Sequence, residues 1–389
     1  MTVDAAGTAG AGAAPEVGAA TGELTFPALP HGLDTPRLVV DVAAVEANIT
    51  RLQAELDGRG VALRPHAKTH KTVAVARMQL EAGADGLTVG TLGEAEVFIG
   101  AGIDDVFLAY PLWADGPKAV RVRALHEASG AFRVGVDSTG GARRLAAAVA
   151  GSAGGRRLRV LVELDPGLRR TGVASPEAAV DVARAARSAG LEVEGVFSHG
   201  GHGYRPGAAQ AAGEDEIRIL TAAADALAND GFAIGTVSAG STPTMLTAAA
   251  GRVTEIRAGT YVYGDRQQWI LGAIPPDGCA VAVAATVVSV FDDRLVIDAG
   301  AKALTKDRAD WVTGFGTIVG YPQLVIDRLN DYHGVVIADP GGARPGLGDV
   351  VAVIPNHICP VVDLVDDVIA IGADGSAEVW RVDARGRSG

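Results

Sequence analysis

Residues 64–71, with the sequence RPHAKTHK, gather two lysines, two histidines and an arginine directly after the apolar run VAL. Three interpretations are open: a solvated basic loop, a metal-binding histidine pair, or a lysine that does chemistry. If Lys68 ends a buried strand, its amine points into the mouth of a barrel, where desolvation lowers its pKa and makes it nucleophilic. His66 and His70 would then straddle the strand end and point in different directions, which disfavours a metal site there.

A second set of residues could bind an anion. In SAGSTPT (residues 238–244), Thr242 would cap a helix that starts at Pro243, and a helix N-terminus is a ready-made phosphate site. The alternative is an ordinary capped turn. The segment RAGTYVYGD (residues 257–265) could bring further N–H groups to the same phosphate. A phosphate site opposite the amine of Lys68 is what pyridoxal phosphate needs, and its candidate residues are Gly240, Ser241, Thr242, Gly259 and Thr260.

Polar side chains also follow two other apolar runs. DPGLRRTGV places Arg170 after one of them, and SHGGHGY places His199, His202 and Tyr204 after the next. Any one of these residues could be a satisfied structural residue. Their clustering at strand ends favours a functional role.

The segment PNHICP (residues 355–360) holds a histidine and a cysteine two residues apart. On a strand, the side chains of His357 and Cys359 would face the same side. Imidazole and thiolate together suit zinc, although an isolated pair of this kind also arises by chance. Two ligands are too few for a closed structural site, so a metal held here would keep positions open for water or substrate.

The elements that must position these groups alternate between short apolar runs and Ala-rich stretches with helical spacing. Eight such units predict a parallel sheet closed into a barrel, with the chemistry at the carboxyl ends of the strands. From about residue 265, β-type runs follow one another without long helices. We therefore expect an α/β fold, a (β/α)8 TIM-type barrel over residues 24–264 and a mainly antiparallel β domain over residues 265–389. The expected barrel strands are 61–68, 86–90, 105–110, 132–137, 159–165, 193–199, 236–241 and 255–262.

Composition limits the partners. The chain has 389 residues, a net charge of −12 and no basic tail, so neither nucleic acid nor a membrane surface is an expected partner. Its two cysteines lie far apart, which suits a reducing cytoplasm. Residues 1–23 are rich in Ala and Gly and have little to bury, so we expect a disordered tail.

The motifs RPHAKTHK, DPGLRRTGV, SHGGHGY, AGSTPT, RAGTYVYGD, DAGAKAL and PNHICP occur in this order along the chain. With this ordered set of motifs the sequence resembles the D-serine dehydratase / D-threonine aldolase family. The members of this family are fold-type III pyridoxal-phosphate enzymes related to alanine racemase. The resemblance covers most of the chain after about residue 30. It implies a small D-amino acid substrate and a homodimer with sites near the interface.

The resemblance also implies roles for individual residues. Lys68 would carry the cofactor and later act as general base, while Lys71 would be solvated. The metal pair would be His357 and Cys359. Cofactor contacts are implied for Arg170, His199, Tyr204, Gly240, Ser241, Thr242, Gly259, Thr260 and Tyr261.

The reaction implied is a metal-dependent dehydration that gives a 2-keto acid and ammonia. Dehydratases of the family tend to carry H-x-C with zinc and aldolases H-x-D with manganese or magnesium, so Cys359 favours the dehydratase. A D-threonine or D-3-hydroxyamino-acid aldolase giving glycine and an aldehyde is the main alternative. An amino-acid racemase would need no metal, and a non-catalytic pyridoxal-phosphate-binding protein would lack the β domain.

Overall fold

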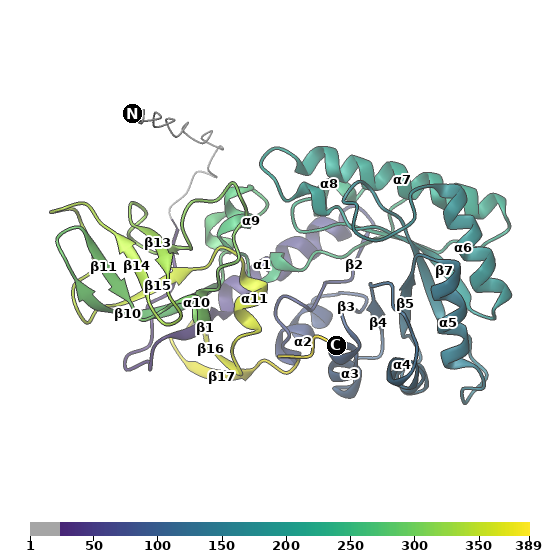
Figure 1. Ribbon diagram of the computed structural model, residues 1–389, viewed down its shortest axis with the longest axis horizontal. Helices are drawn as coiled ribbons and strands as arrows, with labels where there is room; N and C mark the ends of the chain where they lie inside the picture. The colour runs from purple at the N-terminus through teal and green to yellow at the C-terminus, as the bar shows by residue number, and fades with distance from the viewer. Residues whose placement is uncertain (1–23) are drawn as a thin grey trace, which may run out of the picture.

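The computed structural model describes residues 24–389, and the tail expected over residues 1–23 lies outside them. An α/β barrel and a β domain lie side by side, with the barrel helices of residues 117–188 on the side away from the β domain (Figure 1). Within the described residues, no helix combines the length and the apolar character needed to cross a membrane.

The barrel contains all eight strands expected from the sequence, all parallel, in the order β2-β9-β8-β7-β6-β5-β4-β3. The ring closes between β2 and β3, where the N–H of Ala67 donates to the carbonyl of Thr88 and the N–H of Thr88 to that of Pro65, both at 2.8 Å. The strands are β2 Ala62–Leu63, β3 Leu87–Val89, β4 Val106–Leu108, β5 Arg133–Val136, β6 Arg159–Glu163, β7 Glu192–Phe197, β8 Thr236–Ala239 and β9 Glu255–Ile256.

The barrel helices follow local sequence signals. Ser175 accepts a hydrogen bond from the N–H of Ala178 and Pro176 occupies the first helical position, so α6 begins where a capping residue and a proline predict it. The helices are α1 Val42–Asp57, α2 Val73–Glu81, α3 Leu92–Gly100, α4 Pro117–Ala128, α5 Thr139–Val149, α6 Pro176–Ser188, α7 Ala209–Asn229 and the short α8 Met245–Ala248.

A small apolar cluster fills the barrel interior. Phe107, Leu161 and Phe197 are buried together, and the two phenyl rings meet edge to face with centroids 5.1 Å apart. Nearer the amino ends of the strands, the buried guanidinium of Arg64 pairs with Glu255 at 2.6 Å and with Asp105 at 2.7 Å. The interior is therefore packed below its carboxyl end, which leaves only that end open for a ligand.

The β domain takes its first strand from the N-terminal side of the barrel. β1 Arg37–Asp41 pairs with β10 in antiparallel and with β16 in parallel orientation, although we expected residues 24–264 to form the barrel half. Val39 packs there against Leu24 and Ile274, so burial of its apolar side chains explains this position. The other strands are β10 Val281–Val290, β11 Arg294–Ile297, β12 Thr317–Ile318, β13 Val325–Leu329, β14 Gly334–Ile337, β15 Val350–Ile354, β16 Asp367–Ile371 and β17 Ala377–Arg381.

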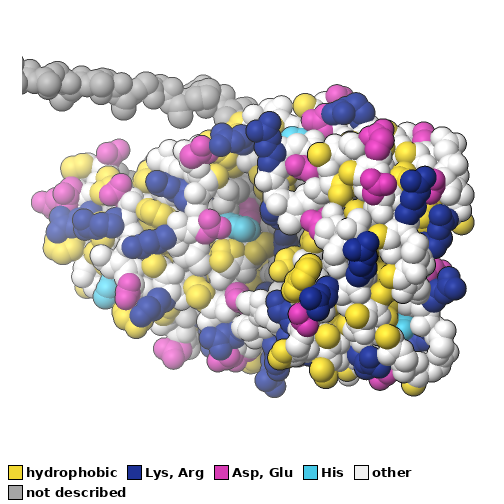
Figure 2. All heavy atoms as spheres, turned by 45° about the vertical axis from the view of Figure 1, so that its right-hand side comes forward, with side chains coloured by type: hydrophobic (Ala, Val, Ile, Leu, Met, Phe, Trp, Pro, Cys, Tyr) yellow, Lys and Arg dark blue, Asp and Glu magenta, His cyan; other side chains and the backbone are white. Residues whose placement is uncertain are grey.

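Short helices of the β domain lie where it meets the barrel (Figure 1). They are α9 Arg266–Ile270, α10 Ala301–Leu304 and α11 Ile358–Val362. On the face shown in Figure 2, acidic and basic side chains are intermixed, and the surface is hollowed between the two domains. This face carries no continuous basic patch of the kind that binds nucleic acid.

Candidate active site

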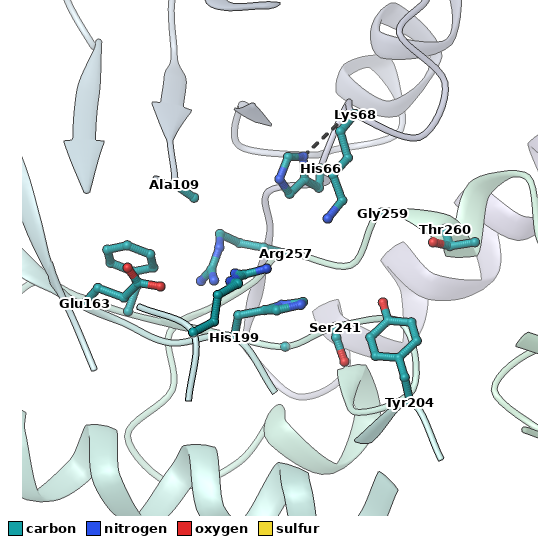
Figure 3. Close-up of a pocket in the computed structure, with 13 residues that line it drawn as sticks. His66, Lys68, Ala109, Glu163, His199, Tyr204, Ser241, Arg257, Gly259 and Thr260 are labelled. Carbon is teal, nitrogen blue, oxygen red and sulfur yellow. Dashed lines mark hydrogen bonds between the residues drawn. The ribbon is translucent and has the colours of Figure 1, made fainter. Parts of the chain in front are cut away.

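A cavity open to solvent lies at the carboxyl ends of the barrel strands, with about 480 Å³ of empty space when the solvent at its mouth is included. Most of its walls come from residues that follow β2, β6, β7, β8 and β9, so the strand ends converge as the barrel predicts. Figure 3 shows Lys68 and His66 on one side of the space and His199 on the opposite side. The wall residues are His66, Lys68, Ala109, Glu163, Arg170, Phe197, His199, Tyr204, Gly240, Ser241, Arg257, Gly259 and Thr260.

Lys68 points its amine into this cavity (Figure 3). The loop that carries it turns at His66, whose Nδ1 accepts the backbone N–H of Lys68 at 3.3 Å. Burial, and then the charge of Lys68, lower the pKa of both His66 and His199 well below the ordinary value. Both rings are therefore uncharged at neutral pH.

His70 lies away from this cavity, which agrees with the expectation that it and His66 point apart. Its ring is buried between Phe98 and Tyr263, and its Nδ1 bonds to the backbone of Thr72. A metal site formed by His66 and His70 is therefore excluded by geometry.

One end of the cavity offers backbone donors to an anion. Among residues 24–389, the N–H groups of Gly259 and Thr260 have no protein acceptor. A Cβ at Gly259 would lie 3.0 Å from the carbonyl oxygen of His66 and from Oγ1 of Thr69, so only glycine lets the two loops approach this closely. Ser241 and Tyr204 flank the same end (Figure 3).

The loop after β8 differs from the expected helix cap. Helix α8 begins at Met245 and not at Pro243, and Thr242 does not cap it. The hydroxyl of Thr242 instead accepts the N–H of Tyr261 at 3.1 Å, which ties the two loops at this end of the cavity together. Tyr261 itself is buried, and its hydroxyl accepts from Gln79 behind the cavity, so it supports the site from outside the wall.

Glu216, a buried residue of α7 that holds this loop, was not predicted from the sequence. Its carboxylate accepts from the N–H of Gly240 at 3.0 Å and from the hydroxyl of Thr244 at 2.8 Å, and that hydroxyl accepts from the N–H of Ser241. We expected the N–H groups of Gly240 and Ser241 to face a phosphate. They instead donate to the carboxylate of Glu216 and to the hydroxyl of Thr244. Glu216 lies inside a helix with ordinary amphipathic spacing, so no local signal distinguishes it.

The opposite end of the cavity carries two arginines and a carboxyl group. Arg257 is buried and donates to the hydroxyl of Ser238 at 2.6 Å, and Arg170 stands at the exposed rim. Glu163 lies beside them, with one carboxylate oxygen bonded to Thr171 at 3.0 Å and the other without a partner. Neither Arg257 nor Glu163 was predicted as a site residue. Both are charged residues inside expected barrel strands, and a charge in an otherwise apolar strand was the signal that could have identified them.

Glu163 provides a pH-dependent prediction. Burial raises the pKa of its carboxyl to about 7 from an ordinary value of 4.5. The folded protein keeps a proton that the unfolded chain releases, so this stabilisation is complete below pH 4.5 and is lost as the pH rises through 7. Urea unfolding of cofactor-free wild type and Glu163→Gln should show the wild type losing up to about 3 kcal/mol relative to the variant between pH 4.5 and 8. Equal pH profiles would contradict the shift.

The histidine and cysteine of PNHICP lie at the start of α11 and not on a strand. β15 ends at Ile354, His357 precedes the helix and Cys359 is its second residue. The reason is a distant carboxylate: buried Asp265, which caps α9, also accepts the N–H of Ile358 at 3.2 Å. Residues 357–359 therefore form the start of a helix where a strand was expected. The side chains of His357 and Cys359 remain neighbours there.

Cys359 of this pair lies next to the barrel cavity, 3.9 Å from Oγ1 of the wall residue Thr260. The thiol of Cys359 lies 3.4 Å from the hydroxyl of Thr69, next to Lys68 in the chain. Burial is the largest single influence on the Cys359 thiol and would raise its pKa, but His357, Lys68 and Thr69 together lower the pKa below its ordinary value. A carboxylate oxygen of Asp307 contacts Nδ1 of His357 at 2.5 Å, which leaves Nε2 as the free ligand atom.

Lys71, expected to be solvated, is buried with a side-chain exposure of 8%. Its amine contacts Asp363 at 2.7 Å and Glu94 at 3.4 Å, so it has ionic partners from both domains. Lys68 is therefore the only one of the two lysines of this segment that reaches the cavity.

The residues of the cavity fit pyridoxal phosphate. Lys68 is an amine for its aldehyde carbon, and the unused N–H groups of Gly259 and Thr260 suit a phosphate. The donor set of His357 and Cys359 fits a thiophilic metal such as zinc. No group of three or more His, Cys, Asp or Glu side chains able to hold a metal occurs within residues 24–389, so such a metal would keep open positions.

Family models match both domains. Residues 40–267 match the alanine racemase N-terminal domain, and residues 280–371 match a putative serine dehydratase domain. The chain is 35% identical to D-threo-3-hydroxyaspartate dehydratase of Delftia sp. over 90% of this chain and 97% of that protein. It is 33% identical to D-threonine aldolase of Arthrobacter sp. over 92% of this chain and 94% of that protein.

Solved structures agree with these matches. The Delftia dehydratase superposes with a TM-score of 0.79 at 33% identity, over 90% of this chain and 97% of that one. D-threonine aldolase from Filomicrobium marinum gives 0.82 at 29%, over 91% and 96%. A cysteine-to-alanine variant of the dehydratase is known in a metal-free form. This chain therefore belongs to the D-serine dehydratase / D-threonine aldolase family, the fold-type III pyridoxal-phosphate enzymes whose barrel is that of alanine racemase.

Proposed function

We propose that the protein is a pyridoxal-phosphate- and metal-dependent dehydratase of β-hydroxy D-amino acids, which releases a 2-keto acid and ammonia. The observation that carries the proposal is the position of the Cys359 thiol, 3.4 Å from Oγ1 of Thr69 and 3.9 Å from Oγ1 of Thr260, a wall residue of the cavity that holds Lys68. The 35% identity to D-threo-3-hydroxyaspartate dehydratase supports the same substrate class.

Each end of the cavity would have its own task in holding the cofactor. The amine of Lys68 would hold the aldehyde carbon, and Gly259, Thr260 and Ser241 would bind the phosphate. His199 would lie against the ring on the side opposite Lys68 (Figure 3). When bound, pyridoxal phosphate supplies an electron sink for the carbon that carries the amino group.

The chain's own residues would then move the proton. The amine of Lys68 would take the α-proton of the substrate as a general base. Its neighbours His66 and His199 are uncharged, because burial lowers their pKa values, so neither competes as a cation for the substrate carboxylate. Arg170 and Arg257 are the remaining cations at the cavity wall and can bind anionic groups there.

The metal pair would act on the β-hydroxyl. His357 and Cys359 would hold a zinc ion, which as a Lewis acid helps hydroxide to leave. Loss of the α-proton and the hydroxide amounts to loss of water. Hydrolysis of the released enamine returns that water and yields the keto acid and ammonia. A metal-free cysteine variant of the dehydratase relative supports a role for Cys359 as ligand.

Aldol cleavage is the second candidate, because a D-threonine aldolase is 33% identical over 92% of this chain. We expect purified enzyme to convert D-threo-3-hydroxyaspartate or D-serine to keto acid and ammonia, and chelation to stop the reaction. Product analysis with D-threonine separates the two candidates, since cleavage gives glycine and an aldehyde. If glycine were the main product from every substrate, the proposed activity would be aldol cleavage and not dehydration.

The assembly and the location belong to the same proposal. We expect a homodimer, testable by light scattering of the holoenzyme, because the family resemblance implies sites near a subunit interface. Both cysteines are free, and Cys279 is buried in the β domain, which suits a cytoplasmic protein.

A further inference from the structure

Lys71 belongs to the RPHAKTHK segment, but the proposed chemistry does not use it. It follows Lys68 by three residues but turns away from the cavity towards α11. Its backbone has a φ of 53°, in the left-handed region that residues other than glycine rarely adopt. A conformation of this kind persists only where surrounding contacts hold it.

Several contacts hold Lys71 in place. Its N–H donates to the carbonyl of Ala67 at 2.8 Å, and its own carbonyl accepts from Ala384 of the C-terminal segment at 2.9 Å. Its amine reaches Asp363 and, on the other side, the buried Glu94 of α3. Asp363 also accepts the N–H of Gly386 at 3.0 Å, so both domains contribute to one ionic cluster, in which Lys71 and Glu94 are buried and Asp363 is partly exposed.

The same loop thereby touches both ends of the metal-pair helix. Thr69 contacts Cys359 at the start of α11 at 3.4 Å, and Lys71 contacts Asp363, the residue that follows its last turn, at 2.7 Å. Cys359 and Asp363 are four residues apart, so these contacts are separated by about 6 Å along the helix axis. Two contacts so placed fix both the position and the rotation of a short helix relative to Lys68.

We propose that Lys71 is a positioning residue, which through Asp363 holds α11 so that His357 and Cys359 can bind a metal above Lys68. The inference rests on the metal site of the proposed function. A buried ion pair is weak evidence of stabilisation, because its desolvation costs about what its attraction returns. Its use here is to fix the arrangement of two domains that each supply part of one site.

Cobalt titration tests this on the enzyme with its cofactor bound, since a cobalt–thiolate absorption band reports the metal at Cys359. We expect Lys71→Met to raise the cobalt Kd about tenfold or more, the scale seen when residues that orient metal ligands are removed. The Kd for pyridoxal phosphate should stay within about twofold of wild type. Lys118→Met, which removes an exposed lysine of α4, is the matched control and should change neither value.

A double-mutant cycle with Asp363→Asn separates positioning from general damage. If the two residues act as one contact, the double variant should bind cobalt no more weakly than Lys71→Met alone. Unchanged cobalt affinity in a folded Lys71→Met protein, or equal weakening of cofactor and metal, would overturn the inference. If Lys71→Met does not fold, the Asp363→Asn variant alone tests the inference. An unchanged cobalt Kd in that variant would then reject the positioning role of Lys71. Wild type without the cobalt–thiolate band would instead refute the proposed metal site.

Discussion

Replacing Lys68 by alanine should abolish dehydration, with a fall in kcat of about 10⁴-fold or more, because the variant loses both the amine that holds the cofactor and the general base. Lys68 is the only lysine of the cavity wall, so no neighbouring amine can take its place. The measurement is keto acid formation at saturating substrate, with cofactor added in excess.

Borohydride reduction of wild-type holoenzyme followed by peptide mapping provides the direct check on this assignment. The cofactor should be fixed on Lys68 alone. Lys71 is the built-in comparison, since it lies three residues away but is held in a buried ionic cluster. Labelling of Lys71, or retention of activity in Lys68→Ala, would contradict the assignment.

Replacing Cys359 by alanine should lower the rate of dehydration by about 100-fold or more, because a Lewis acid supplies several kcal/mol of charge stabilisation to the departing hydroxyl. Cofactor binding should survive, because the phosphate donors at Gly259 and Thr260 and the amine of Lys68 are untouched. Product assays, cofactor absorbance and metal content of the purified variant together give the measurement.

The matched control is Cys279→Ala. Cys279 is the other free cysteine and is buried in the apolar core of the β domain, so its replacement should leave activity and metal content as in wild type. A Cys359→Ala protein that keeps one equivalent of metal and full activity would show that the metal reading is mistaken. The racemase interpretation would then gain weight.

The local sequence determined the elements of the barrel. Strands and helices have characteristic periods and caps, so the eight apolar runs and signals such as Ser175 and Pro176 predict where elements lie. The barrel in turn brings strand ends together, which is why the order of the motifs along the chain predicts that Lys68, Gly259 and Tyr204 share one cavity.

Long-range contacts decided what the sequence alone could not. Asp265 bonds to Ile358 and turns an expected strand into the start of α11, and Glu216 occupies N–H groups that the motif seemed to offer to phosphate. Similarly, β1 joined the β domain because its apolar side chains are buried there. Each outcome depends on a partner far away in the chain, which no local period or cap encodes.

The burial of Lys71 shows the same limit at the level of a single charge. The sequence predicts that Lys71 is exposed to solvent, because most lysines are exposed. Only the packing of the β domain against the barrel brings Asp363, 292 residues further along the chain, to its amine. The sequence therefore determined which chemical groups the site contains. The docking of the two domains decided the distances between these groups, because the surfaces that dock form only after each domain has folded.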